Sequence, residues 1–143
     1  MKTLLLLLLS LSLLSALTLK RDRSNDTVID NTNQLMWMDG IDNVKLMLDH
    51  HEAEDYCEAL SYAGYSNWRL PHIDEFKLIV DKKNEKNYIN RKFRYQQKAG
   101  YWAETAHFRT FWFYADYMFF ISGTAYYDSR HKKKFVRCVR DIK

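Results

Sequence analysis

Residues 56–71 read YCEALSYAGYSNWRLP, a stretch that predicts a helix end, a turn, a short buried strand and the start of a second helix. Gly64 would supply the left-handed cap of the first helix. Pro71 disfavours helix at Leu70 and is well suited to begin the next helix. We expect the rest of the chain to pack around this stretch.

The first of these helices is predicted to span about residues 50–63. Asp49 followed by Glu52 resembles a capping box that opens it. Apolar residues recur at spacings of three and four, which places Cys57 on the buried face. The second helix is expected to run from Pro71 to about residue 81.

The N-terminus is expected to carry an export signal over residues 1–19. A charged start precedes the largely apolar segment 4–19, which is short for a membrane span. Cleavage patterns around Ala16 are weak, so an uncleaved anchor is the alternative. Residues 20–27 are polar and are expected to be a flexible leader to a domain over residues 28–143.

The chain has two cysteines, so Cys57 has one possible intramolecular partner, Cys138. An oxidising compartment after export favours their pairing. The link would close a loop of 81 residues and contribute roughly 4 kcal/mol in the chain-entropy model. Two free buried thiols are the alternative.

Charge is divided unevenly along the chain. Residues 1–81 carry 7 Lys/Arg and 13 Asp/Glu, a net charge of −6, whereas residues 82–143 carry 15 and 5, a net charge of +10. This split indicates either an anionic partner for the C-terminal half or attraction between the two halves within one fold.

Strands are predicted on both sides of the helices. Residues 28–38 favour a β-hairpin with Leu35 and Trp37 on one face. Residues 82–100 are polar and basic and are expected to be a functional or mobile loop. Aromatic and β-forming residues then predict strands over 101–105, 110–121, 124–127 and 135–140, with both faces of the 110–121 strand covered.

This order predicts an α+β fold in which two helices pack on a mainly antiparallel sheet with one disulfide. Aromatic residues make up 15% of the chain, and 4 Gly and 1 Pro are few. A disordered or collagen-like chain is therefore excluded, and the length suits a single domain with one core.

The chain resembles the Lcl C-terminal domain family over about residues 28–141. The matching motifs are LMW at 35–37, YCEAL at 56–60, AGYSNWRLP at 63–71, YWAET at 101–105 and VRCVR at 136–140. The resemblance implies a compact C-type-lectin-like domain whose last strand is disulfide-bonded to its first helix.

The family is named for the C-terminal domain of a bacterial collagen-like adhesin associated with binding sulfated glycosaminoglycans. The resemblance thus implies a binding module of the bacterial cell envelope. This chain lacks any Gly-X-Y stretch, so trimerisation and adhesion do not carry over. The loop and strand motifs of calcium-dependent lectins are also absent from the sequence, so calcium is not expected.

We expect neither catalysis nor a metal site. His50 and His51 are adjacent rather than four residues apart, and no nucleophile elbow, phosphate loop or dinucleotide fingerprint occurs. The rival class is an enzyme related to formylglycine-generating or other sulfatase-modifying proteins. Those enzymes depend on an active-site cysteine pair, whereas both cysteines here are assigned to the predicted disulfide.

Ligand-binding candidates lie in the basic C-terminal half. The predicted turn at Arg130, Lys132, Lys133 and Lys134 would form an anion-binding rim, with a solvated turn as the alternative. Trp102 and Arg137 would add an aromatic and arginine floor, with core packing as the alternative. The residues expected to be structural are Trp37, Trp68, Arg69, Leu70 and Pro71, with Arg69 as a buried ion-pair partner.

The expected function is that of a non-enzymatic module, periplasmic or secreted, that binds an anionic glycan or an acidic protein surface. A structural envelope subunit without a small ligand is a further alternative. No cofactor, no nucleic-acid partner and no stable membrane span after signal cleavage are expected. The sequence leaves the ligand and the oligomeric state open.

Overall fold

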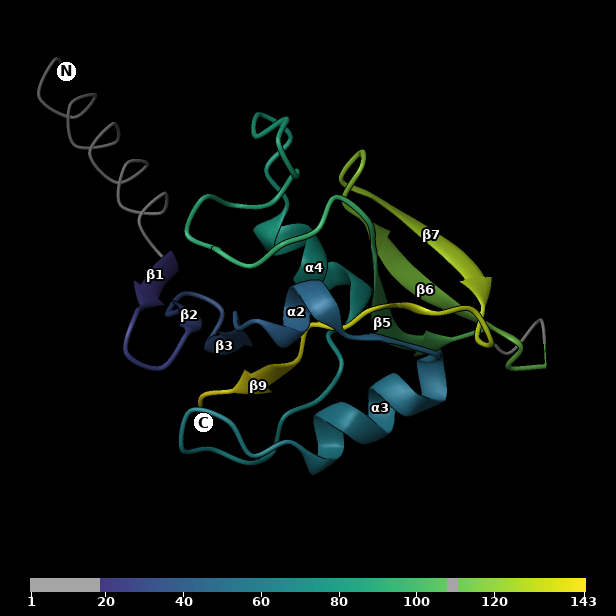
Figure 1. The fold of residues 1–143 in the computed structure, drawn as a ribbon, viewed down its shortest axis with the longest axis horizontal. Coiled ribbons are helices and arrows are strands. Elements are labelled where there is room, and N and C mark those ends of the chain that lie inside the picture. The colour runs from purple at the N-terminus through teal and green to yellow at the C-terminus, as the bar shows by residue number, and fades with distance from the viewer. Residues whose placement is uncertain (1–18, 108–110) are drawn as a thin grey trace, which may run out of the picture.

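The computed structural model describes residues 19–107 and 111–143, so the expected signal segment lies, apart from Leu19, outside the described residues. Two sheets make up the fold, with strand orders β1-β2-β3-β9 and β4-β8-β5-β6-β7. Figure 1 shows the first sheet at one side and strands β5–β7 at the other. The strands are β1 (Leu19–Asp22), β2 (Thr27–Asp30), β3 (Leu35–Met38), β4 (Met47–Leu48), β5 (Gly100–Ala106), β6 (Tyr114–Phe119), β7 (Thr124–Ser129), β8 (Lys134–Phe135) and β9 (Val139–Asp141).

Three helices are described: α2 (Asp42–Lys45), α3 (His50–Ala59) and α4 (Ile73–Ile79). The α+β class is confirmed, and the strands pair antiparallel except for the parallel contact of β5 with β8. Two details differ from the prediction, because there are two sheets rather than one and α2 is an additional single turn. The predicted last strand over 135–140 is split, so that β8 joins one sheet and β9 the other.

The N-terminal hairpin is confirmed, since β2 pairs with β3 from Thr27 opposite Met38 to Asp30 opposite Leu35. The flexible leader expected over residues 20–27 is not confirmed, because β1 pairs along its whole length with β2. An edge strand is held mainly by backbone hydrogen bonds to its one neighbour, so the sequence of β1 needs no apolar period, although Leu19 packs on the core and the Arg21 side chain is largely covered.

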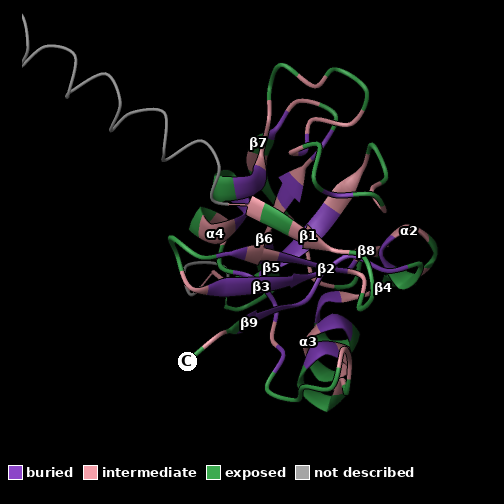
Figure 2. Ribbon diagram, turned by 90° about the vertical axis from the view of Figure 1, so that its left-hand side faces the viewer, coloured by how far each residue is buried: buried purple, intermediate pink, exposed green. Residues whose placement is uncertain are grey.

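The capping box of α3 is confirmed. Asp49 Oδ1 accepts the Glu52 N–H at 2.9 Å, and Glu52 Oε2 accepts the Asp49 N–H at 3.0 Å. Figure 2 shows buried positions on one side of this helix and exposed positions on the other. The helix ends at Ala59 rather than at residue 63, and Gly64 does not cap it. Gly64 instead lies in a tight turn whose flanking residues, Tyr62 and Tyr65, form a β-bridge.

The basic loop over residues 82–100 is anchored to the core. Ile89 is fully buried and Phe93 is nearly so, and both belong to the apolar cluster around Trp37. The sequence gives little sign that the loop is anchored, because two isolated apolar residues in a polar segment do not form the periodic pattern of a helix or a strand. The loop is therefore a functional candidate with a fixed position rather than a mobile one.

The predicted strand over 110–121 begins later, at Tyr114. Phe111, Trp112 and Phe113 lie before it and are 82%, 53% and 58% exposed, so the expectation that both faces are covered fails at this end. Residues 108–110 lie outside the described part of the chain.

Strand β3 separates two apolar cores, because successive side chains of a strand point to opposite faces. Leu35 and Trp37 belong to one core, and Met36 and Met38 belong to the other. The second core also contains both cysteines. A strand buried on both sides reads as a continuous apolar run, which is what residues 35–38 show.

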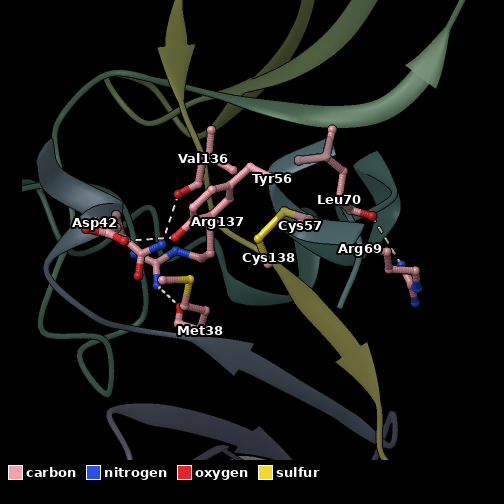
Figure 3. The surroundings of a disulfide bond; sticks show 10 residues. Met38, Asp42, Tyr56, Cys57, Arg69, Leu70, Val136, Arg137 and Cys138 are labelled. Atoms are coloured by element: carbon pink, nitrogen blue, oxygen red, sulfur yellow. Dashed lines mark hydrogen bonds between the residues drawn. A yellow bond between two sulfur atoms is a disulfide. The ribbon is translucent and has the colours of Figure 1, made fainter. Parts of the chain in front are cut away.

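The disulfide between Cys57 and Cys138 is confirmed, with the two Cα atoms 5.6 Å apart and a sequence separation of 81. Figure 3 shows it between α3 and the segment that precedes β9. It therefore joins the first long helix to the stretch of chain that passes from one sheet to the other.

Replacing both cysteines with Ser should lower the free energy of unfolding by about 4 kcal/mol, since the unfolded chain loses its largest covalent constraint. Urea denaturation measures this loss. A reducing agent should lower the denaturation midpoint of the wild type and leave that of C57S/C138S unchanged. Equal midpoints for the oxidised and reduced wild type would contradict a stabilising disulfide.

Candidate functional site

The predicted basic rim between β7 and β8 is divided by the structure. Lys132 and Lys133 are exposed, but Lys134 is largely covered and its Nζ lies 2.9 Å from Asp128 Oδ2. The same ammonium lies 3.9 Å from the centre of the Tyr117 ring. Lys134 is thus a packing residue, and the turn offers fewer available cations than its sequence suggests.

Arg130 is also engaged. Its Nε donates to His50 Nδ1 at 2.9 Å, and its Nη2 lies 3.3 Å from Glu54 Oε1. The Arg130 N–H donates to the Phe113 carbonyl at 2.8 Å. This side chain joins the turn after β7, helix α3 and the residues before β6.

Trp102 and Arg137 do not form a ligand floor, because both side chains are fully buried. Trp102 Nε1 donates to the Leu48 carbonyl at 3.0 Å. The residues expected to be structural are placed as predicted, with Trp37, Trp68, Leu70 and Pro71 buried. Arg69 is half-buried and makes a two-point ion pair with Glu75 at 2.7 and 2.8 Å.

Arg137 forms an ion pair with Asp39 at 3.0 Å, and both side chains are fully buried. Its guanidinium also donates to the carbonyls of Met38 and Tyr95. Burial lowers the pKa of Arg137 to about 10, so it remains charged at neutral pH. Asp39 in turn accepts the backbone N–H groups of Arg94 and Tyr95 at 2.7 and 3.1 Å, and Arg21 contacts its carboxylate.

These contacts bring together a set of cations, most of them in the predicted basic loop, that sequence reasoning did not select as a site. A cleft of about 410 Å³ is lined by the N-terminal Arg21, Arg23 and Asp26 and by residues 91–94 of the basic loop. An adjoining cleft of about 370 Å³ shares Arg91, Phe93 and Arg94 and adds residues such as Lys86. We call Arg23, Lys86, Arg91, Lys92 and Arg94 the cationic surface.

The cationic surface has little internal compensation. None of its five side chains forms an ion pair with another described residue. The one carboxylate that lines the clefts, that of Asp26, lies 2.9 Å from Arg21 Nη2. Such a concentration of unpaired charge creates a positive potential that attracts anions.

A second candidate lies near the start of β6. A cleft of about 450 Å³ is lined by three aromatic residues, Phe111, Trp112 and Phe113, and by four polar ones, Asp49, His51, Arg130 and His131. We call it the aromatic cleft. In Figure 1 the chain on either side of residues 108–110 lies at the end of the molecule opposite to β1, the strand that Arg23 of the cationic surface directly follows.

Two residues of the aromatic cleft have an unfavourable backbone conformation. The φ angles of Phe111 and Trp112 are 50° and 65°, in the left-handed region that bulky side chains avoid. Each such residue costs about 1–3 kcal/mol and persists only where its surroundings fix it. The Trp112 N–H donates to the His107 carbonyl at 3.1 Å, and Arg130 Nη1 donates to the Trp112 carbonyl at 3.3 Å.

The buried ring of His50 is linked to the aromatic cleft through Arg130. Its Nε2 lies 2.8 Å from the Ala103 carbonyl, while Nδ1 accepts from Arg130 Nε and also lies 2.8 Å from Glu54 Oε1. This arrangement fits a neutral ring with its proton on Nε2. Burial lowers the pKa of His50, and burial raises the pKa of the neighbouring Glu54.

Residues 19–107 and 111–143 contain no cluster of three or more His, Cys, Asp or Glu side chains placed to hold a metal ion. Among the helices of that same part of the chain, none has the length and apolar character needed to cross a membrane.

The structure thus defines an α+β domain of two sheets in which a disulfide joins a helix to the C-terminal segment. The chain belongs to the Lcl C-terminal domain family, whose family model matches residues 26–140. Comparisons with curated proteins and with solved structures give no match.

Replacing Asp39 with Asn should lower the free energy of unfolding by about 3–5 kcal/mol, because it leaves the Arg137 charge buried without its partner. Urea denaturation measures the loss. The double variant D39N/R137M should be more stable than D39N, since it removes the orphaned charge. The exposed control Asp74→Asn should change stability by less than about 0.5 kcal/mol. A D39N variant as stable as this control would contradict the role of the pair.

His50 should make the protein less stable as pH falls. The unfolded chain takes up a proton near the ordinary pKa of His, whereas the buried ring resists it, so stability is lost below about pH 6.5. Glu54 has the opposite effect on stability as pH falls. Its pKa is raised by burial, so its protonation favours the folded state. The test is therefore a comparison of variants.

The stability difference between the wild type and His50→Gln should shrink by about 1 kcal/mol between pH 7.5 and 5.5. Urea denaturation at the two pH values gives this number. The exposed His131→Gln variant is the control and should follow the wild type at both. A constant difference for H50Q would contradict a neutral buried ring.

Proposed function

We propose that this domain is an exported, non-enzymatic binding module of the cell envelope whose ligand is an anionic polymer, with sulfated glycan as the leading class. The observation that carries the proposal is the cationic surface, where five unpaired Lys and Arg side chains line two adjoining clefts. Lys and Arg on a surface bind polyanions largely through the release of counterions.

The fixed backbone beneath the cationic surface supports this proposal. Asp39 holds the N–H groups of Arg94 and Tyr95, so this part of the loop is positioned before a ligand arrives. A preformed cluster loses less entropy on binding than a disordered basic tail. The disulfide supports export, because structural disulfides persist in oxidising compartments.

The enzyme alternative receives less support. The two cysteines of the chain are joined to each other in a buried disulfide between α3 and the C-terminal segment, so neither is a thiol available for sulfatase-modifying chemistry. Their side chains belong to the core rather than to a cleft.

The test is retention on immobilised heparin over a range of salt concentrations, with the variant R91Q/K92Q/R94Q. Affinity should fall steeply between about 50 and 200 mM salt, as for other polyelectrolyte complexes. The variant should bind more weakly and its salt slope should decrease by roughly 2 to 3, since three cations are lost and each removes about 0.7–0.9 from the slope. Desulfated heparin should bind less well than heparin.

The matched control is K132Q/K133Q/K143Q, which removes the same charge from exposed positions elsewhere. Both variants should keep the melting temperature of the wild type, because the replaced charges are exposed. If the control loses more of the salt slope than R91Q/K92Q/R94Q, the turn between β7 and β8 is the binding surface. Retention of the wild type that is insensitive to salt would refute a polyanion ligand.

A further inference from the structure

The aromatic cleft is not explained by anion binding. Among its lining residues Phe111, Trp112 and Phe113 are each more than half exposed. Apolar groups of this size gathered around a concave site mark a place of ligand contact. The backbone at Phe111 and Trp112 is strained, and neither ring belongs to the two apolar cores.

The charges around the aromatic cleft nearly cancel. Arg130 faces Glu54 and the neutral His50, so its positive charge is already compensated. Asp49 contributes one negative charge, and its Oδ1 accepts the helix N–H of Glu52. The aromatic cleft therefore lacks the excess of positive charge that distinguishes the cationic surface.

The polar rim and the rings together restrict the ligand class. A purely apolar ligand would remove water from the Asp49 carboxylate and the His131 ring without offering them hydrogen bonds in exchange. A polyanion would gain little where the charges are balanced. A pyranose ring suits both the aromatic rings and the polar rim. Its C–H face packs on an aromatic ring, and its hydroxyl groups donate and accept hydrogen bonds at the edge.

We propose that the aromatic cleft is a second binding site, specific for a neutral oligosaccharide. Phe111 and Trp112 form the stacking surface, and Asp49 and His131 meet the hydroxyl groups. Arg130 is a positioning residue, since it holds the carbonyls of Trp112 and Phe113 against α3. The volume of about 450 Å³ lies in the range of small-ligand sites.

Trp112 gives this proposal a built-in reporter. The other tryptophans, Trp37, Trp68 and Trp102, are at most 2% exposed, whereas Trp112 is 53% exposed. Quenching of fluorescence by a small solute should therefore act mainly on Trp112, and a bound sugar should protect it. The probes are cellotriose and triacetylchitotriose, with dextran sulfate as the anionic comparison.

We expect at least one of the two neutral trisaccharides to protect Trp112 saturably, with a dissociation constant of about 1 mM or tighter. Phe111→Gly should weaken this binding by about tenfold or more, because it removes a stacking face. Glycine also accepts the left-handed φ of this position, so the melting temperature of F111G should be equal to or higher than that of the wild type. Leu78→Ala, which removes an exposed apolar side chain on α4, is the control and should bind as the wild type does.

The proposal is overturned if neither trisaccharide protects Trp112 at about 10 mM, since even millimolar affinity would be visible there. It is also overturned if F111G binds the sugar as tightly as the wild type, or if dextran sulfate protects Trp112 and the neutral sugars do not. None of these outcomes bears on R91Q/K92Q/R94Q, so this site and the proposed anion-binding function fail or stand separately.

Discussion

The buried ion pair of Asp39 with Arg137 is the interaction on which the arrangement of the domain depends. Arg21 from β1, the N–H groups of Arg94 and Tyr95, and the Arg137 guanidinium all meet at one carboxylate. Four stretches that are far apart in the sequence are thereby fixed at one point. Two charges removed from water are costly unless their hydrogen-bonding capacity is met, and here backbone groups meet most of it.

The disulfide lies one residue from this pair and acts on the same stretch of chain. Cys138 is joined to α3, and the segment then enters the smaller sheet as β9. Arg137 and Cys138 point to different neighbours because successive residues of an extended chain alternate in direction. The ion pair and the disulfide therefore fix the crossing between the sheets from two sides. Figure 3 shows the side chains of Arg137 and Cys138 together.

Features set by neighbours in the sequence could be predicted, and features set by distant contacts could not. The capping box at Asp49, the hairpin over 28–38 and the pairing of the only two cysteines follow from local pattern and counting. The cationic surface joins Arg23 to Arg91, which requires knowing that β1 is ordered. The covering of Lys134 likewise depends on Asp128 and Tyr117, whereas the run of basic residues that precedes it in the sequence suggested exposure.

Part of the uneven charge of the two halves is balanced by ion pairs within the fold. Arg137 pairs with Asp39 and Arg130 with Glu54, so part of the attraction between the basic and acidic halves is internal. The cations of these two ion pairs, Arg130 and Arg137, both follow β5 in the sequence. The basic loop contributes its backbone N–H groups to Asp39 and keeps the side chains of Arg91, Lys92 and Arg94 outside. The fold thus neutralises the basic residues that cross the core and exposes those of the loop, and this separation leaves a positive surface on a domain whose interior charges are balanced.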